Sequence, residues 1–158
     1  MNLHLGCGEV YIQGWINIDL HNAKADVKAD CKAIPYPDNS ADMVLASHLL
    51  EHFDFKEAFV VLAEWKRVLK PGGMLIIEVP DLLEHCKIVV SSPSDCSTAM
   101  PGIYGFPWLP GHAHKYGYTP DQLMWTLQTA GFREVMHMPN TQFYTHLGKT
   151  CMRFECKK

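Results

Sequence analysis

Apolar residues recur along this chain with two different spacings, and the alternation of the two predicts strands and helices in turn. The segments 3–5 and 16–20 are short apolar stretches, and 43–46 and 74–79 are longer runs with little polar interruption. Such runs are typical of strands that are covered on both faces, as in a parallel sheet with helices on both sides. Residues 25–30 are a weaker candidate for a third strand.

Between the strand candidates, apolar residues follow the helical spacing. From 55 to 69 they lie three or four residues apart, which predicts an amphipathic helix that the Lys-Pro-Gly-Gly sequence at 70–73 ends. A further helix is expected at 81–90, and two strand candidates, 132–138 and 150–156, finish the chain. This alternation specifies an open α/β sheet. Its ligand should lie beyond the carboxyl ends of the strands, near the point where the strand order switches.

Residues 91–118 break both spacings and are rich in Ser, Pro, Gly and aromatic residues. An irregular stretch of this length is uncommon in a compact domain and is usually functional or mobile. Helical order returns at Thr119, which is expected as an N-cap, with Pro120 in the first helical position and Gln122 closing a capping box. Gly131 is expected to end that helix.

The first strand ends in the Gly-Cys-Gly sequence at 6–8, and the second strand ends in Asp19. Glycines in such a turn let backbone N–H groups approach a ligand that a Cβ would hold away. A carboxylate at the next strand tip can accept both hydroxyls of a ribose. The third glycine of the dinucleotide fingerprint is missing, and only 13 positions separate Gly6 from Asp19, against roughly 20 in that fingerprint. The pattern therefore predicts a smaller adenosyl ligand without phosphates.

The composition predicts one domain, 1–158, because 158 residues that are 47% hydrophobic and 20% charged are typical of a globular chain. The net charge of -3 gives no electrostatic footprint for nucleic acid or an anionic membrane. No apolar run reaches the ~18 residues of a membrane span, and no signal peptide follows Met1. The six cysteines form no C-x-x-C pair. These features predict a soluble domain in the cytoplasm.

Seven short motifs, in order along nearly the whole chain, resemble those of class I S-adenosylmethionine-dependent methyltransferases. More narrowly, the chain resembles the small bacterial and phage-type methyltransferase domains that are associated with polysaccharide or surface-sugar pathways. The motifs are Leu-His-Leu-Gly-Cys-Gly at 3–8, Gly-Trp-Ile-Asn-Ile-Asp at 14–19, Ala-Asp at 29–30, Ser-His-Leu-Leu-Glu-His at 47–52, Leu-Lys-Pro-Gly-Gly at 69–73, Ile-Tyr-Gly at 103–105, and His-Lys-Tyr-Gly-Tyr at 114–118. Each motif alone is weak, and together they are specific.

The resemblance implies an α/β, single-domain Rossmann-like methyltransferase fold, with a mostly parallel seven-stranded sheet, helices on both faces and an antiparallel last strand. In this subgroup a compressed connection at 14–15 replaces the full first helix, which accounts for the short spacing between Gly6 and Asp19. The implied cofactor is S-adenosylmethionine, and the implied reaction is in-line methyl transfer to a small-molecule or sugar acceptor. Such a displacement depends chiefly on alignment of the reacting atoms.

The resemblance also assigns the cofactor-binding residues, which all follow strand ends: Gly6, Cys7, Gly8, Asp19, Asp30, Cys31, Ser47 and His48. The turn at 6–8 is expected to pass under the methionine portion of the cofactor. Asp19 is expected to hold the ribose, since a carboxylate offers two acceptor oxygens to paired hydroxyls. Asp30 is expected to hold the adenine amino group, with the backbone of Cys31 beside it, and Asp26 is the competing candidate in this register.

The acceptor side is expected to follow the fourth strand and to include the end of the irregular segment. The expected substrate-binding residues are Glu51, His52, Tyr104 and Lys115. His114 and His112 are the expected catalytic residues, with His114 favoured, because a histidine that titrates near neutrality is the usual base for a hydroxyl or amine. Capping or orienting the following helix is an equally good role for Glu51 and His52. The segment 91–118 is the expected lid, because its glycines and aromatic residues suit a mobile cover.

The chain starts directly at its first strand, without the N-terminal segment that often covers the cofactor in this class. A cover is therefore expected from 91–118 or from a second copy of the chain in a homodimer, and neither nucleic acid nor a membrane is an expected partner. Two other functions stay open. One is a module that binds S-adenosylmethionine without turnover. The other, disfavoured by the missing third glycine, is an NAD-dependent sugar-modifying enzyme.

No metal is expected, although two histidine patterns suggest one. His48-Leu-Leu-Glu51-His52 spells the H-x-x-E-H pattern of inverted zinc peptidases. That chemistry needs both histidines on one helical face and a third ligand on a later helix, whereas here the pattern starts at the tip of a buried strand and lacks an evident third ligand. His112 and His114 stand two residues apart, but no spaced set of cysteines or carboxylates accompanies them.

Overall fold

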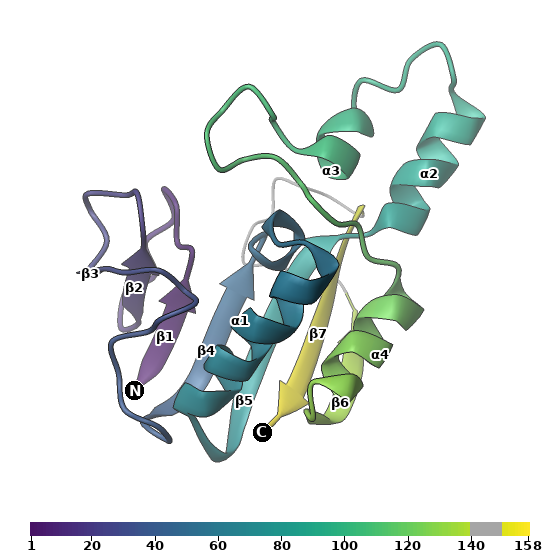
Figure 1. The fold of residues 1–158 in the computed structure, drawn as a ribbon. Coiled ribbons are helices and arrows are strands. Elements are labelled where there is room, and N and C mark those ends of the chain that lie inside the picture. Colours follow the sequence, from purple (N-terminus) through teal and green to yellow (C-terminus); the bar gives the residue numbers. More distant parts are fainter. Residues whose placement is uncertain (140–149) are drawn as a thin grey trace.

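The strands of the computed structural model, which describes residues 1–139 and 150–158, form one sheet (Figure 1). The strands are β1 (Asn2–Leu5), β2 (Ile16–Asp19), β3 (Val27–Lys28), β4 (Ala41–Ser47), β5 (Leu69–Pro80), β6 (Arg133–Met138) and β7 (Cys151–Lys157). Their order is β3-β2-β1-β4-β5-β7-β6. The first five strands pair in parallel, and β7 runs antiparallel to both β5 and β6. The predicted mostly parallel seven-stranded sheet with an antiparallel last strand is confirmed.

Two long helices pack on one face of this sheet. In chain order, the helices of the described residues are η1 (Leu50–His52), α1 (Phe55–Val68), α2 (Leu82–Ser91), α3 (Met100–Tyr104) and α4 (Pro120–Thr129). The two that pack on this face are α1 and α4. Figure 1 shows α1 in front of the central strands and α4 in front of the β6–β7 side, while α2 and α3 lie beyond the carboxyl ends of the strands. No described helix is long and apolar enough to cross a membrane.

The core lies between α1, α4 and the sheet, and it follows the predicted spacings. Alternate strand residues face the helices, and the helix residues three or four apart face the strands. The fully buried members include Leu3, Leu5, Val44, Ala46, Leu75 and Ile77 on the strands, Ala58, Val61, Leu62, Trp65 and Val68 on α1, and Leu123 and Leu127 on α4. The helices predicted at 55–69, 81–90 and from 120 onward are therefore present, with ends that differ by one or two residues.

The expectation of helices on both faces is wrong for the described residues. The connections 6–15 and 20–26 contain no helix, so the face opposite α1 is covered differently. There the buried Asn17 side chain accepts a hydrogen bond from the Ile12 amide at 2.9 Å and donates one to the Ile12 carbonyl at 3.1 Å. Its Oδ1 also lies 3.0 Å from Nδ1 of buried His4. A side-chain amide thus holds the short connection against the sheet where a longer connection would pack a helix.

The residue directly before α1 and the residue directly before α4 each cap the N-terminus of that helix. Asp54 caps α1: its carboxylate accepts hydrogen bonds from the amides of Lys56 and Glu57 at 2.8 and 2.9 Å, and the Glu57 carboxylate accepts from the Asp54 amide. Asp54, and not Glu51 or His52, is therefore the cap of α1. At α4, Thr119 accepts from the Gln122 amide at 3.3 Å as predicted.

The segment 91–118 is more regular than its sequence suggested. It contains α3, and it folds back on itself through an isolated antiparallel bridge between Gly105 and Ala113. Its C-terminal part is tied to η1, because the Glu51 carbonyl accepts hydrogen bonds from the amides of Lys115 and Tyr116 at 2.8 and 3.2 Å. These backbone contacts fix where the side chains of 113–116 lie relative to the end of β4.

Candidate functional site

The carboxyl ends of β1, β2, β3 and β4 meet at one edge of the sheet, and the strand order switches between β1 and β4. In open α/β sheets ligands bind at such a switch point. Gly6 follows β1 with φ +59°, and a Cβ on it would lie 2.7 Å from Cδ1 of Leu49 in the β4 turn. The two turns are therefore in direct contact, and only glycine satisfies both the backbone conformation and the spacing. The sequence analysis did not identify Leu49.

Asp19 ends β2 with its carboxylate directed to the β1 turn. It accepts hydrogen bonds from the amides of Gly8 at 2.9 Å, His21 at 2.7 Å and Asn22 at 2.8 Å. Burial by itself raises the pKa of Asp19, but these three amides outweigh it and hold that pKa below its ordinary value. A carboxylate has about four acceptor positions, so the anionic Asp19 keeps room for a ligand hydroxyl on the oxygen that Gly8 contacts.

Asp30 and Cys31 follow the short β3 and are fixed to α1. The Asp30 carboxylate accepts from the Lys32 amide at 2.8 Å, and the carbonyl of buried Cys31 accepts from the Trp65 indole at 3.1 Å. The competing candidate Asp26 is used within the fold, because its carboxylate accepts from the Asn17 backbone amide and side chain and from a tyrosine hydroxyl. The structure therefore favours Asp30 over Asp26 as a ligand contact.

Ser47 ends β4, but its side chain does not reach the strand-end edge. The buried hydroxyl donates to Oε2 of Glu78 on β5 at 2.6 Å, and Arg153 lies 3.7 Å from the other oxygen of Glu78. Ser47 thus belongs to a polar cluster across β4, β5 and β7, since strand residues alternate between the two faces. The Ser47 side chain is therefore engaged by Glu78.

His48 adopts φ +52°, a left-handed conformation that is uncommon outside glycine. Residues held in such strained conformations cluster at functional sites. Its Nδ1 lies 3.3 Å from Oε1 of Glu51, and its Nε2 lies 3.6 Å from Sγ of Cys151. Burial lowers the pKa of His48, but Cys151 and Glu51 outweigh it and raise that pKa to about 10. Cys151 comes 103 residues later, and the sequence carried no signal that it would reach this turn.

Glu51, His52 and His114 meet just beyond β4 and form what we name the Glu-His-His cluster. Oε1 of Glu51 lies 4.0 Å from Nε2 of His114, and the two imidazole rings are 5.1 Å apart in an edge-on arrangement. One ligand atom from each residue lies within 4.8 Å of the others. The Glu51 side chain is 1% exposed. Burial raises its pKa, but the neighbouring histidines, His48 above all, outweigh this and keep the pKa below its ordinary value.

The side chains of three other predicted acceptor residues are exposed or have partners outside this cluster. His112 is exposed, and its amide donates a hydrogen bond to the Leu109 carbonyl in a turn of the segment. The Tyr104 side chain is also exposed. Lys115 extends to α1, where its Nζ lies 3.1 Å from Glu57. Of the two histidines considered as catalytic, the structure brings only His114 to Glu51.

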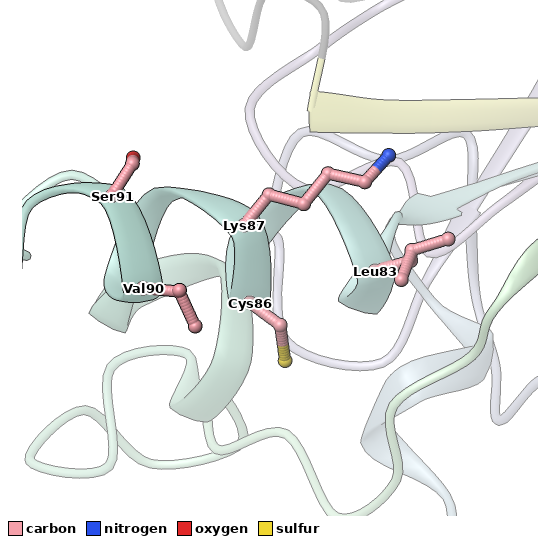
Figure 2. Close-up of a pocket in the computed structure, with 5 residues that line it drawn as sticks. All are labelled: Leu83, Cys86, Lys87, Val90 and Ser91. Carbon is pink, nitrogen blue, oxygen red and sulfur yellow. The ribbon is translucent and has the colours of Figure 1, made fainter.

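A surface hollow of about 350 Å³ lies elsewhere, along α2 (Figure 2). It is lined by Leu83, Cys86, Lys87, Val90 and Ser91, which all belong to that one helix. None of the predicted site residues borders it. The hollow is therefore an exposed apolar helix face and not the predicted cofactor site.

Comparisons with known proteins show what this chain resembles. Residues 3–77, which run from β1 to the middle of β5, match the family model described as methyltransferase domain. The ubiquinone/menaquinone biosynthesis C-methyltransferase UbiE of Cupriavidus taiwanensis is 34% identical over 98 residues, which are 60% of this chain and 37% of that protein. The chain thus spans less than half the length of this curated relative.

Solved structures show the same fold. A SAM-dependent methyltransferase from Archaeoglobus fulgidus superposes with a TM-score of 0.63 and 21% identity over 99% of this chain and 85% of the other. The 1,6-didemethyltoxoflavin-N1-methyltransferase of Burkholderia thailandensis, solved with its substrate and S-adenosylhomocysteine, gives 0.64 and 16% over 99% and 70%. The chain therefore has the fold that these solved methyltransferases share, as predicted from the sequence, and its first half matches the methyltransferase domain model.

Proposed function

We propose that this chain is an S-adenosylmethionine-dependent methyltransferase that acts in the cytoplasm on a small-molecule or sugar acceptor. The observation that carries the proposal is the meeting of the glycine turn at 6–8, the anionic Asp19 and the β4 turn at the strand-order switch. The family match over these strands and the cofactor product held by one structural neighbour support it.

The bound cofactor supplies a methyl group on a sulfonium, so the work of the chain is alignment. The turn at 6–8 presents backbone without Cβ atoms at two of its three positions, which admits a ligand at close range. Asp19 accepts a ribose hydroxyl, and the Asp30 oxygen that Lys32 does not use accepts the adenine amino group.

The acceptor end of the site is the Glu-His-His cluster, which lies just beyond the β4 turn that contacts Gly6. Its carboxylate and imidazole groups suit an acceptor that must be oriented and deprotonated. A hydroxyl or amine on a sugar or small molecule meets that description. The named activities of the relatives, C-methylation and N-methylation, make a ring carbon or nitrogen the alternative acceptor atom.

Asp19→Ala tests the cofactor site. Calorimetry with S-adenosylhomocysteine should show a loss of about 1.5–3 kcal/mol, the range for hydrogen bonds to a charged group, or roughly 10- to 150-fold in Kd. Asp26→Ala is the matched control, because it removes a carboxylate that serves the fold; it should leave the Kd nearly unchanged. Equal Kd values for Asp19→Ala and the unmodified chain would exclude the assignment.

The two other functions give different results in the same assays. A module without turnover would bind S-adenosylhomocysteine and yield no methylated product across a panel of sugars, phenols and amines. An NAD-dependent enzyme would show a thermal shift with NAD and none with S-adenosylhomocysteine. The absence of the third glycine favours an adenosyl ligand without a pyrophosphate over NAD.

A further inference from the structure

The Glu-His-His cluster contains a buried carboxylate whose hydrogen bonds are incomplete. Neither Oε1 nor Oε2 of Glu51 receives a well-directed hydrogen bond from a described residue, although the side chain is 1% exposed. Nδ1 of His48 faces Oε1 at 3.3 Å, and Oε2 has no hydrogen-bond donor in the described part of the chain. Buried charges are normally paired, hydrogen-bonded or bound to a metal. The unmet oxygen of this buried carboxylate is therefore available to a further donor or to a cation.

Both histidines of the cluster are held in the same way by backbone carbonyls. Nδ1 of His52 lies 3.0 Å from the Ala113 carbonyl, and Nδ1 of His114 lies 3.0 Å from the Gly102 carbonyl. A carbonyl only accepts, so each Nδ1 carries the proton and each Nε2 keeps its lone pair. Nε2 of His114 is also the atom that faces Glu51. Histidine ligands of metals almost always show this arrangement, in which the second ring nitrogen donates to a carbonyl or carboxylate.

We propose that Glu51, His52 and His114 form a site for a divalent transition-metal ion, with zinc as the first candidate. Two imidazoles and one carboxylate are the protein ligands of several catalytic zinc sites, which keep a further position for water or substrate. The histidine that completes the set comes from the segment 91–118. This explains why no third ligand was evident near the H-x-x-E-H pattern in the sequence, and His48 of that pattern is not among the three.

The ligand atoms lie close to the spacing that zinc requires. With bonds of about 2.0–2.1 Å in a tetrahedral site, neighbouring ligand atoms are roughly 3.3–3.5 Å apart. The observed separation of Oε1 and Nε2 of His114 is 4.0 Å, and the largest within the set is at most 4.8 Å. Binding therefore asks the ligand atoms to approach one another by about 1 Å.

A metal at this place would have a use in the proposed function. Only this use, and not the binding of the metal, rests on the proposed function. A zinc ion with three protein ligands binds an oxygen in its open position and lowers the pKa of that group. An acceptor hydroxyl bound there would be oriented and more readily deprotonated. Binding of the metal itself depends only on the three side chains and is tested separately.

Metal binding by the unmodified chain is measured first, by zinc titration in a calorimeter after removal of metals with a chelator. We expect one zinc per chain, and two histidine side chains should shift their Nε2 resonances in ¹⁵N-detected spectra. Cobalt(II) then reports the ligands, because cysteine thiolates give an intense charge-transfer band and a site of imidazoles and a carboxylate does not. The six free cysteines make this control necessary.

The variants His114→Gln and Glu51→Gln should each lose the stoichiometric zinc. His112→Gln is the matched control, since it removes an exposed histidine two residues away and should retain one zinc per chain. Circular dichroism checks that each variant is folded. If a variant does not fold, the histidine spectra of the unmodified chain show whether the two histidines bind zinc. No zinc bound, a cobalt–thiolate band, or zinc retained by His114→Gln would each overturn the proposal. The affinity for S-adenosylhomocysteine, measured by calorimetry, should be the same before and after treatment with the chelator. It therefore tests the proposed function independently of the metal.

Discussion

Gly6→Ala tests whether the packing of the β1 turn against the β4 turn holds the site together. Gly6 has φ +59°, and an added Cβ would lie 2.7 Å from Cδ1 of Leu49. Gly8, two residues later, has φ +48° and no atom within 4 Å of an added Cβ. An alanine would therefore meet the same left-handed backbone at both positions, but only at Gly6 would its Cβ contact Leu49. Gly8→Ala is thus the control.

The expected losses follow from these two terms. A left-handed backbone costs an alanine about 1–2 kcal/mol at either position. At Gly6 the Leu49 side chain must also leave its rotamer, at about 0.5–1.5 kcal/mol. We therefore expect Gly6→Ala to lower the free energy of unfolding by about 1.5–3.5 kcal/mol and Gly8→Ala by about 1–2 kcal/mol.

Urea unfolding followed by circular dichroism measures both losses, provided that the slope with urea is the same for all variants. Leu49→Ala combined with each glycine variant completes two double-mutant cycles. The cycle with Gly6 should show a coupling of about 0.5–1.5 kcal/mol and the cycle with Gly8 none, because only contacting residues couple. If both variants lose equal stability and neither cycle shows coupling, the turns do not depend on each other and the argument fails.

Two further predictions concern the elements around the site. Asp54→Ala should destabilise the chain by about 0.5–2 kcal/mol, the cost of a lost N-cap, whereas Lys56→Ala should change little because only its amide takes part; equal losses in thermal unfolding would contradict the capping box. Burial lowers the pKa of His4 below its ordinary value, so the unfolded chain binds a proton more readily at that residue. Its contribution to stability is then present above about pH 6.5 and is lost as the pH falls below it. His4→Gln, which keeps a donor toward Asn17, should reduce the drop in urea midpoint between pH 7.5 and 5.5, and an unchanged drop would contradict this.

Local features of the sequence were enough to predict most strands and helices. Strand alternation and the helical spacing report which side chains are buried, and that information lies within a few consecutive residues. The strand-end residues of the cofactor site were predicted for a related reason. Parallel strands bring their carboxyl ends to one edge, so Gly6, Asp19 and Asp30 needed only the correct order of elements to meet there.

The partners of individual side chains were decided only by the tertiary structure. Spacing does not say what a buried residue touches, and it therefore missed that Ser47 faces Glu78. It also placed helices on a face that the described part of the chain covers with the Asn17 amide.

The acceptor side depends on contacts between distant segments. Glu51 and His114 are 63 positions apart, and backbone hydrogen bonds from 115 and 116 to the Glu51 carbonyl bring them together. The same contacts leave His112 outside in a turn and direct Lys115 to Glu57. The sequence by itself determined the residue types available for this site and the strand ends that form the proposed cofactor site. The chain path of 91–118 decided which histidine reaches the carboxylate, because that path is set by packing and backbone hydrogen bonds that no local pattern encodes.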